Sequence, residues 1–353
     1  MTVRSVSVVV VTWNGLDLTQ RCLDSLGRQQ VAGREVEVVV VDNGSTDGTV
    51  AALRARGDVR VVPLGRNTGF AGGVNAGVAA TSGDVVVLLN NDAVAEPGYL
   101  EHLVAPFDAE HGGHGGHGGH GVDGARLGAT TGRVVLSGRF RSGAPGEPGL
   151  VDHAGGTWVR TDDASGALLL NSTGNEVTRS GNGRDRDWLA PASAPAAPAA
   201  VFGFNGGSAA IARAALEDAG PLDESLFMYY EDTELSWRLR RRGWAVAHVH
   251  DAVTVHDHAG SSDATSAFFR DHNERNRLLV ALVHAPVPVV ARAFARSVAR
   301  VVLGPERRRR ATVLARVLGR TPGALRRRRT VDRAARVPRA DVAALLVPDG
   351  SPA

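Results

Sequence analysis

Four short segments follow one another within the first 92 residues and constrain the fold more than any other feature of the chain. They are VVVVTWNG at residues 8–15, VVVVDNGSTDGT at 38–49, RNTGFAGGVNAG at 66–77 and VVVLLNND at 85–92. Valine-rich runs of this kind are typical of strands that are covered on both faces. Three of the segments end such a run in polar residues, and the other opens a glycine-rich helix.

The intervals between the valine-rich runs have the composition of helices, so strands and helices alternate. This order predicts an α/β protein with a mostly parallel sheet flanked by helices, and a ligand site at the carboxyl ends of the strands. The expected strands are 5–12, 36–42, 59–63 and 84–90, and the expected helices are 15–29, 46–56 and 69–82.

Composition excludes several classes of protein. The 353 residues are 43% hydrophobic, which is enough for a sizeable core. Cys22 is the only cysteine, so an intrachain disulfide or a cysteine zinc cluster is excluded, and a reducing, cytoplasmic location is expected. The first apolar run, Val6 to Val11, is too short for a signal-peptide core, and no stretch reaches the roughly 18 apolar residues of a spanning helix.

Charge divides the chain into an acidic body and a basic tail. Residues 286–340 hold 16 arginines against Glu306 and Asp332, whereas the rest holds 24 arginines against 35 acidic residues. Arginines recur every four residues from Arg292 to Arg300 among valines and alanines, which predicts an amphipathic basic helix. The pattern favours contact with an anionic membrane surface, although docking of the tail on the acidic body remains open. Nucleic-acid binding is not expected, because the tail lacks interleaved aromatic residues.

The middle of the chain carries weaker signals. HGGHGGHGGHG at 111–121 has no apolar residue to bury, so a flexible loop is expected; metal binding by its histidines is the less favoured alternative. Residues 122–190 suggest short strands and long loops in an order that the sequence leaves open. APASAPAAPAA at 190–200 predicts an extended connection.

Polar residues after the first two strands are candidates for binding a nucleoside. Thr12, Trp13 and Asn14 follow the first strand, and Asp42 follows the second. A carboxylate at this position of a doubly wound sheet accepts hydrogen bonds from ribose hydroxyls or from the base. DNGSTDG is also rich in turn-forming residues, and by itself the turn would be the preferred interpretation.

The glycine-rich segment is the candidate for the phosphates or the donor sugar. Gly69 and Gly72 allow close approach of the backbone at the start of a helix, and Arg66 and Asn67 add polar groups. Tight packing of the helix on the sheet is the alternative. Asp92, directly after an apolar strand, is the candidate ligand for Mg²⁺ or Mn²⁺, which prefer oxygen ligands and would bridge diphosphate oxygens.

A fifth segment, FMYYEDTELSWRLRRRGW at 227–244, completes the set of motifs. Acids at the start of a helix interact favourably with its dipole. The apolar and aromatic residues before them predict in addition that at least one acid lies at the edge of a pocket with raised proton affinity.

Together the five segments resemble family 2 glycosyltransferases of the GT-A fold, particularly rhamnosyltransferase-like members. The resemblance covers residues 5–108 and 200–284 and implies a Rossmann-like sheet. Asn90, Asn91 and Asp92 match the Asn-x-Asp form of the family's metal-binding motif, and His256 stands where some relatives have a histidine metal ligand. Its alternative is an ordinary histidine at the end of a strand.

The resemblance also implies the catalytic residues. The family motif Glu-Asp-x-Asp/Glu-Leu matches residues 231–235, which makes Asp232 the candidate base and Glu231 the second choice. Acceptor contacts are implied near Asn205, Gly206 and Gly207. The implied domains are 1–284, composed of a nucleotide-sugar half (5–108), a loop-rich insertion (109–199) and an acceptor half (200–284), followed by the Arg-rich helical tail 285–353.

The implied reaction is inverting transfer of a sugar, with L-rhamnose the leading candidate, from a dTDP- or UDP-sugar to a saccharide or lipid-linked acceptor in cell-wall or polysaccharide synthesis. The location would be cytoplasmic, peripheral on the inner face of the plasma membrane. Two alternatives stay open, a catalytically silent nucleotide-sugar binding protein and a polyanion-binding protein that acts through its tail. The first strand lacks a Gly-x-Gly-x-x-Gly turn, which disfavours a nicotinamide dehydrogenase.

Overall fold

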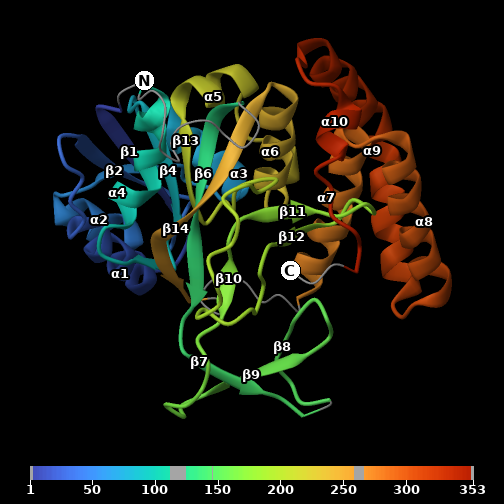
Figure 1. The fold of residues 1–353 in the computed structure, drawn as a ribbon, viewed down its shortest axis with the longest axis horizontal. Coiled ribbons are helices and arrows are strands. Elements are labelled where there is room, and N and C mark those ends of the chain that lie inside the picture. Colours follow the sequence, from blue (N-terminus) through green and yellow to red (C-terminus); the bar gives the residue numbers. More distant parts are fainter. Residues whose placement is uncertain (1–2, 112–124, 145, 258–265, 351–353) are drawn as a thin grey trace.

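The computed structural model describes residues 3–111, 125–144, 146–257 and 266–350. A nine-stranded sheet forms its centre, in the order β3-β2-β1-β4-β13-β6-β14-β5 with β10 beside β6, and helices cover its faces (Figure 1). The His-Gly repeat at 111–121 lies outside the described residues except for His111. The predicted α/β class and the mostly parallel sheet are confirmed.

The first half follows the predicted alternation closely. β1, β2, β3 and β4 are mutually parallel, and the helices between them lie within about three residues of their predicted limits. The elements are β1 (Ser5–Thr12), α1 (Leu16–Gly27), β2 (Glu35–Asp42), α2 (Thr49–Arg56), β3 (Arg60–Pro63), α3 (Gly69–Ala79), β4 (Val85–Asn90), β5 (Ala93–Ala95), α4 (Tyr99–Val104) and the 3-10 helix η1 (Ala105–His111). The valines at positions 8–10 of β1, 39–41 of β2 and 85–87 of β4 are buried, as strands covered on both faces require, whereas Val36 near the start of β2 is exposed.

The second half completes the sheet and adds a small lobe. β13 (Ser208–Ala212) runs antiparallel to β4 and β6, and the long strand β14 (Trp244–His256) runs parallel to β6 (Arg126–Leu136). The lobe is a separate sheet of β7 (Arg139–Ser142), β8 (Leu150–Val151) and β9 (Thr157–Thr161). Further elements are β10 (Leu170–Ser172), β11 (Asn175–Val177), β12 (Gly183–Asp185), α5 (Arg213–Ala219), the 3-10 helix η2 (Glu224–Leu226) and α6 (Glu231–Arg241).

The C-terminal segment forms helices that stand beside α6 at one side of the sheet (Figure 1). They are α7 (Ala267–His284), α8 (Val287–Leu303), α9 (Arg307–Ala334) and α10 (Arg339–Ala343). Val289 and Ala293 of α8 and Val317 of α9 belong to a buried apolar cluster with residues of α6 and α7. Ion pairs add to this contact, for example Arg241 with Asp332 at 2.6 Å.

The basic tail is therefore docked on the acidic body, which is the alternative that the sequence left open. The helices themselves are as predicted, but one face of α8 is buried against the protein. Among the described residues, no helix combines the length and the apolar character that a bilayer-spanning segment needs.

Candidate functional site

Segments far apart in the sequence meet at one edge of the central sheet. Thr12 at the end of β1 is paired in register with Asp42 of β2, and Val11 with Asn90 of β4. β13 begins antiparallel to the end of β4, with Ser208 opposite Leu89. The turn before β13, and the helix α6 bonded to that turn, therefore lie at the same edge as the polar residues of the first half.

Asp42 and Asn14 bind their two loops to each other. The buried carboxylate of Asp42 accepts hydrogen bonds from the backbone NH groups of Gly44 and Ser45, both at 3.1 Å to Oδ2. The NH of Asn14 donates to Ser45 Oγ at 2.9 Å, and Asn14 Oδ1 accepts from the NH of Thr46 at 2.8 Å. The turn interpretation of DNGSTDG is thus correct for the side chain of Asp42, and its contact with a nucleoside stays a prediction.

Asn43 is a residue of this edge that sequence reasoning missed. Its Nδ2 donates to Asn67 Oδ1 at 3.2 Å and to the carbonyl of Gly69 at 3.0 Å, and its Oδ1 accepts from the NH and the hydroxyl of Thr68. It therefore fastens the loop after β2 to the start of α3. Arg66 and Asn67 lie exposed on this loop, and Trp13 is 55% exposed on the neighbouring one. We call Thr12, Asn14, Asp42, Asn43 and Asn67 the nucleotide edge.

The glycines of RNTGFAGGVNAG serve close packing. Gly69 has φ +76°, and a Cβ there would lie 2.1 Å from the carbonyl oxygen of Phe227. A Cβ at Gly72 would lie 2.6 Å from Thr68 Oγ1, and at Gly77 2.3 Å from Val9 Cγ1. Helix α3 thus approaches the sheet and the loop before α6 more closely than any side chain would allow. Packing, the alternative interpretation, accounts for these glycines, and the contact of Gly69 and Gly72 with a ligand stays a prediction.

Asp92 and His256, the two metal-ligand candidates, lie against each other, and their binding of a metal stays a prediction. Oδ1 of Asp92 lies 3.0 Å from Nε2 of His256, and Nδ1 of the same ring lies 2.7 Å from Asn171 Oδ1. Burial lowers the pKa of His256, but the hydrogen bond and the charge of Asp92 outweigh burial and raise it. Asn91 instead turns inward, where its Nδ2 donates to Thr12 Oγ1 and Thr19 Oγ1.

The Asp92–His256 pair has the donor atoms that a divalent metal requires. Asn171 accepts the Nδ1 proton of His256, which fixes the ring with Nε2 directed at Asp92, and such an outer partner is typical of metal-bound histidines. The described residues contain no group of three or more His, Cys, Asp or Glu side chains placed to hold a metal. Within the described part of the chain, Asp92 and His256 are thus the two candidate ligands at this place. Mg²⁺-type sites commonly complete their shell with substrate phosphates and water.

Glu231 and Asp232 form the second part of the site. Burial, with the charge of Asp232 adding to it, raises the pKa of Glu231 to about 8. Glu231 Oε2 is buried and has no hydrogen-bond partner among the described residues. Burial also raises the pKa of Asp232. The hydrogen bonds that its carboxylate accepts from the NH groups of Gly206 and Thr233 lower this pKa, but burial outweighs them. The raised proton affinity that the apolar FMYY segment predicts is confirmed.

Asp185 links the two parts, and the sequence did not reveal it. Burial raises its pKa to about 6, and the neighbouring charges are those of Asp232, which adds to the rise, and of His256, which opposes it. Asn205 Nδ2 donates to Asp185 Oδ1 at 2.7 Å. Asp185 comes from β12 in the region 122–190, where no motif marks it. We call Asp185, Glu231 and Asp232 the acid cluster.

The turn Asn205–Gly207 joins the acid cluster to the end of β4. The NH of Gly206 donates to Asp232 Oδ2 at 3.1 Å, and the NH of Asn90 donates to the carbonyl of Gly207 at 3.0 Å. Acceptor contact by this turn stays a prediction, but its position beside Asp232 agrees with that role.

Glu234 differs from its neighbours on the same helix. It is buried against Arg238 at 2.7 Å, His284 at 2.9 Å and Arg327 at 3.0 Å. Burial alone would raise the pKa of Glu234, but Arg238, His284 and Arg327 lower it by more than burial raises it. The net shift of the pKa is therefore downward. The third acid of the motif therefore stays ionised and ties α6 to α7 and α9.

Comparison with known proteins agrees with this geometry. Residues 7–142 match the model of glycosyl transferase family 2. A relative over a longer span is the N-acetylglucosaminyl-diphospho-decaprenol L-rhamnosyltransferase of Mycobacterium tuberculosis, 29% identical over 72% of this chain and 76% of the relative. The succinoglycan biosynthesis protein ExoO of Rhizobium meliloti is 38% identical over 30% of this chain and 31% of its own length. The chain thus matches only about a third of the length of that relative.

Two solved structures share the fold of this chain. GalNAc-T7 with UDP, GalNAc and Mn²⁺ superposes with a TM-score of 0.59 at 16% identity, over 88% of this chain and 54% of GalNAc-T7. S. aureus TarS 1–349 gives a TM-score of 0.51 at 17% identity, over 97% of this chain and 83% of TarS. The GT-A fold of the chain is confirmed.

Proposed function

We propose that this chain is an inverting glycosyltransferase that uses a nucleoside-diphosphate sugar. The observation that carries the proposal is the meeting, at one sheet edge, of a carboxylate–histidine pair with an acid cluster whose members differ in proton affinity. Transfer of a sugar needs positive charge at the diphosphate and a base for the incoming hydroxyl, and the two parts of the site match these two needs.

Asp92 and His256 are the residues that would hold the metal. A divalent ion bound there supplies positive charge that stabilises the departing nucleoside diphosphate. The remainder of the site acts through side chains. Asn171 keeps the ring of His256 in place, and the nucleotide edge holds the loops that would surround the base and the ribose.

Asp232 is the proposed base. Glu231, with a pKa of about 8, keeps its proton at neutral pH, whereas Asp232 accepts two backbone NH groups that favour its ionised form. Pairs of acids whose environments separate their proton affinities commonly divide the catalytic roles in this way. The acceptor oxygen bonds to the anomeric carbon, the bond to the diphosphate oxygen breaks, the nucleoside diphosphate keeps that electron pair, and Asp232 takes the hydroxyl proton.

A dTDP- or UDP-sugar is the proposed donor, with L-rhamnose as the leading sugar. The similarity to the mycobacterial L-rhamnosyltransferase supports this choice. The name of that relative, an N-acetylglucosaminyl-diphospho-decaprenol L-rhamnosyltransferase, also supports a diphosphate-linked lipid saccharide as acceptor, in the synthesis of cell wall or polysaccharide.

The proposed location is cytoplasmic, at the inner face of an anionic membrane. One side of α8 exposes Val298, Val302 and Leu303, of which Leu303 is 79% exposed. Arg292, Arg296 and Arg300 follow the same helix. Exposed apolar side chains on a helix that is rich in arginine suit the interface of an anionic bilayer. Flotation with vesicles tests this: wild type should bind phosphatidylglycerol vesicles, and Val302→Asp/Leu303→Asp should bind several-fold less. Equal binding by both proteins would contradict it.

A donor panel tests the enzymatic proposal. dTDP-, UDP- and GDP-sugars are incubated with the full chain and Mg²⁺ or Mn²⁺, and release of the nucleoside diphosphate is measured with and without a pyrophosphoryl-lipid saccharide. We expect one donor class to turn over, with inversion at the anomeric carbon by NMR. Absence of turnover with every donor, or a product with retained configuration, would overturn the proposal.

A further inference from the structure

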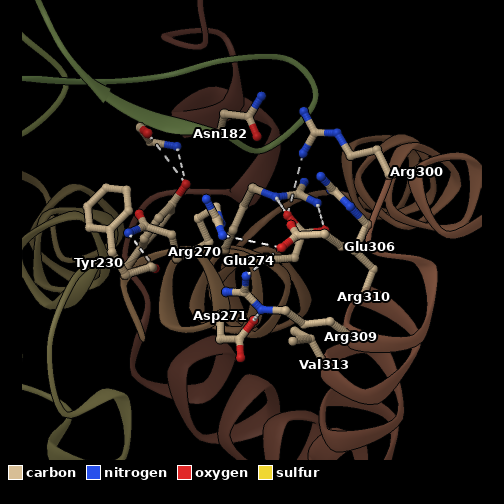
Figure 2. A pocket seen from close by; sticks show the side chains of 14 residues that line it. Asn182, Tyr230, Arg270, Asp271, Glu274, Arg300, Glu306, Arg309, Arg310 and Val313 are labelled. Carbon is tan, nitrogen blue, oxygen red and sulfur yellow. Dashed lines mark hydrogen bonds and ion pairs between the residues drawn. The ribbon is translucent and has the colours of Figure 1, made fainter. Parts of the chain in front are cut away.

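An arginine-rich pocket lies beside the acid cluster and is not used by the mechanism above. Its volume is about 480 Å³, which is within the range of roughly 300–1,000 Å³ for small-molecule sites. Tyr230, the residue before Glu231, lines it, as does Gly183, two residues before Asp185. The remaining wall comes from α7 and from the basic helices α8 and α9 (Figure 2).

The lining of this pocket carries an excess of positive charge. It includes five arginines, Arg270, Arg277, Arg300, Arg309 and Arg310, against three acids, Asp271, Glu274 and Glu306. Figure 2 shows side chains of α7, α8 and α9 reaching toward Glu274 and Glu306 from different sides. A pocket with two more arginines than acids is suited to an anion of about two charges.

Each acid of the lining is already paired. Glu274 pairs with Arg277 at 3.0 Å and with Arg300 at 3.6 Å. Asp271 pairs with Arg309 at 2.9 Å, and Glu306 pairs with Arg309 at 3.1 Å and with Arg270 at 3.3 Å.

Arg310 is the arginine whose charge the lining leaves uncompensated. Its Nε donates to the carbonyl of Pro305 at 2.9 Å, and no carboxylate of the described residues forms an ion pair with its guanidinium. Burial and the nearby charges of Arg277 and Arg310 lower the pKa of Arg300, which agrees with crowding of cations at this place. Arg310 is therefore the side chain most available to an anionic ligand, and Arg300 follows because its pair with Glu274 is the longest in the lining, at 3.6 Å.

We propose that this pocket binds the diphosphate group of the acceptor. The inference rests on the proposed function, which assigns the donor diphosphate to the Asp92–His256 pair and gives this pocket no role. A saccharide whose hydroxyl reaches Asp232 would place its own anionic group past Tyr230. A lipid attached to that group would leave along α8, where Arg300 is followed by the exposed Val302 and Leu303.

The test compares ligands that differ only in the diphosphate. Binding of an N-acetylglucosamine diphosphate with a short prenyl chain and of the matching prenyl glycoside without phosphate is measured by calorimetry on the full chain. Saturating nucleoside diphosphate and Mg²⁺ keep the donor site filled. Wild type should bind the diphosphate ligand at least about tenfold more tightly, since hydrogen bonds to charged groups make the difference. Equal affinities for the two ligands would overturn the proposal.

Variants locate the effect. Arg310→Ala should weaken binding of the diphosphate ligand roughly tenfold, and the double variant Arg300→Ala/Arg310→Ala should weaken it further. Binding of the glycoside should change little in both variants. Arg308→Ala is the matched control, because Arg308 is exposed on the same helix outside the pocket. Thermal melts identify any variant that fails to fold, and Arg310→Gln is then the gentler substitution. If Arg308→Ala weakens binding as much as Arg310→Ala does, the proposal is wrong.

Two further readouts separate this inference from others. Phosphatidylglycerol vesicles that contain no diphosphate lipid should not displace the bound diphosphate ligand from the protein. If they do displace it, the pocket recognises lipid headgroups and the acceptor assignment fails. Diphosphate binding that requires Arg310, in a protein that turns over no donor in the panel above, would overturn the proposed function and confirm the diphosphate site alone.

Discussion

The nucleotide edge and the acid cluster lie at the same end of the sheet but differ in how their polar side chains are paired. At the nucleotide edge, Asp42 and Asn43 use their polar atoms to bind neighbouring loops. In the acid cluster, Asp185 and Glu231 have raised pKa values, and Glu231 Oε2 lacks a hydrogen-bond partner among the described residues. In the first region the polar side chains have hydrogen-bond partners that hold the loops together. In the second region the carboxylates are desolvated and repel one another.

Under the proposed function, this difference divides the site into a region for binding and a region for chemistry. A satisfied polar frame costs little to maintain and holds its shape, which suits recognition of a nucleoside. Crowded, desolvated acids destabilise the fold locally and are typical of sites that move protons. Changes at the nucleotide edge should therefore alter donor affinity, whereas changes in the acid cluster should alter the chemical step and its pH dependence.

The largest effect is expected where the two regions meet, at Asp92. Asp92→Ala removes the carboxylate of the Asp92–His256 pair, and we expect sugar transfer to fall by about 10²–10⁴-fold, because a bound metal contributes several kcal/mol to transition-state stabilisation. Steady-state transfer rates with Mn²⁺ measure it. Asp58→Ala, on an exposed loop, is the control. Wild-type rates in Asp92→Ala would contradict the role of Asp92 as a metal ligand.

The next effect concerns stability and the burial of Glu231. Its pKa is raised to about 8 from an unfolded value near 4.5, so the unfolded chain releases this proton first and the free energy of unfolding falls as pH rises from about 4.5 to 8. Glu231→Gln removes that decline, which should amount to about 1–3 kcal/mol. Urea unfolding of both proteins at pH 5 and pH 8 measures it, and identical pH dependence in the two would contradict the burial of this acid.

A smaller effect is expected at the nucleotide edge. Asn43→Ala removes the side-chain hydrogen bonds that hold the start of α3, at a cost of about 1–2 kcal/mol. We expect the KM for the donor to rise roughly tenfold with kcat changed by no more than about threefold. Donor-saturation kinetics check this. A loss confined to kcat would break the division between the two regions.

The smallest effect is a shift of the pH profile. Transfer should rise with pH as Asp232 loses its proton, and Asp185→Asn removes a negative charge near it, so the rise should move to lower pH by about half a unit. The profile of kcat/KM between pH 5 and 9 measures the shift, with the exposed Asp163→Asn as control. A shift to higher pH would show that Asp185 does not repel charge on Asp232.

The sequence predicts the first half of the molecule well for a physical reason. Buried parallel strands must be almost continuously apolar, so β1, β2 and β4 are visible in their valines, and the residues after them are at the ligand edge by topology alone. The meeting of Asp92 with His256, 164 residues apart, came from the family resemblance; periodicity gives no sign of it.

Other features lie beyond sequence reasoning because they depend on long-range packing. Asp185 stands in a region of short strands whose order no local pattern fixes. The roles of Gly69 and Gly72 depend on how near Phe227 and Thr68 come. Docking of the tail depends on apolar side chains that pack against α6 and α7. It depends also on ion pairs of Asp223, Glu234 and Asp271 with arginines of α9.

The central claim is that the acid cluster and the nucleotide edge act on one activated sugar, with Asp232 as the base. The direct measurement is the rate of sugar transfer to a diphosphate-linked saccharide by wild type and by Asp232→Asn, with the preferred donor and Mn²⁺. We expect transfer by wild type and a loss of about 10²–10⁴-fold in Asp232→Asn. Equal rates in the two proteins would contradict the claim.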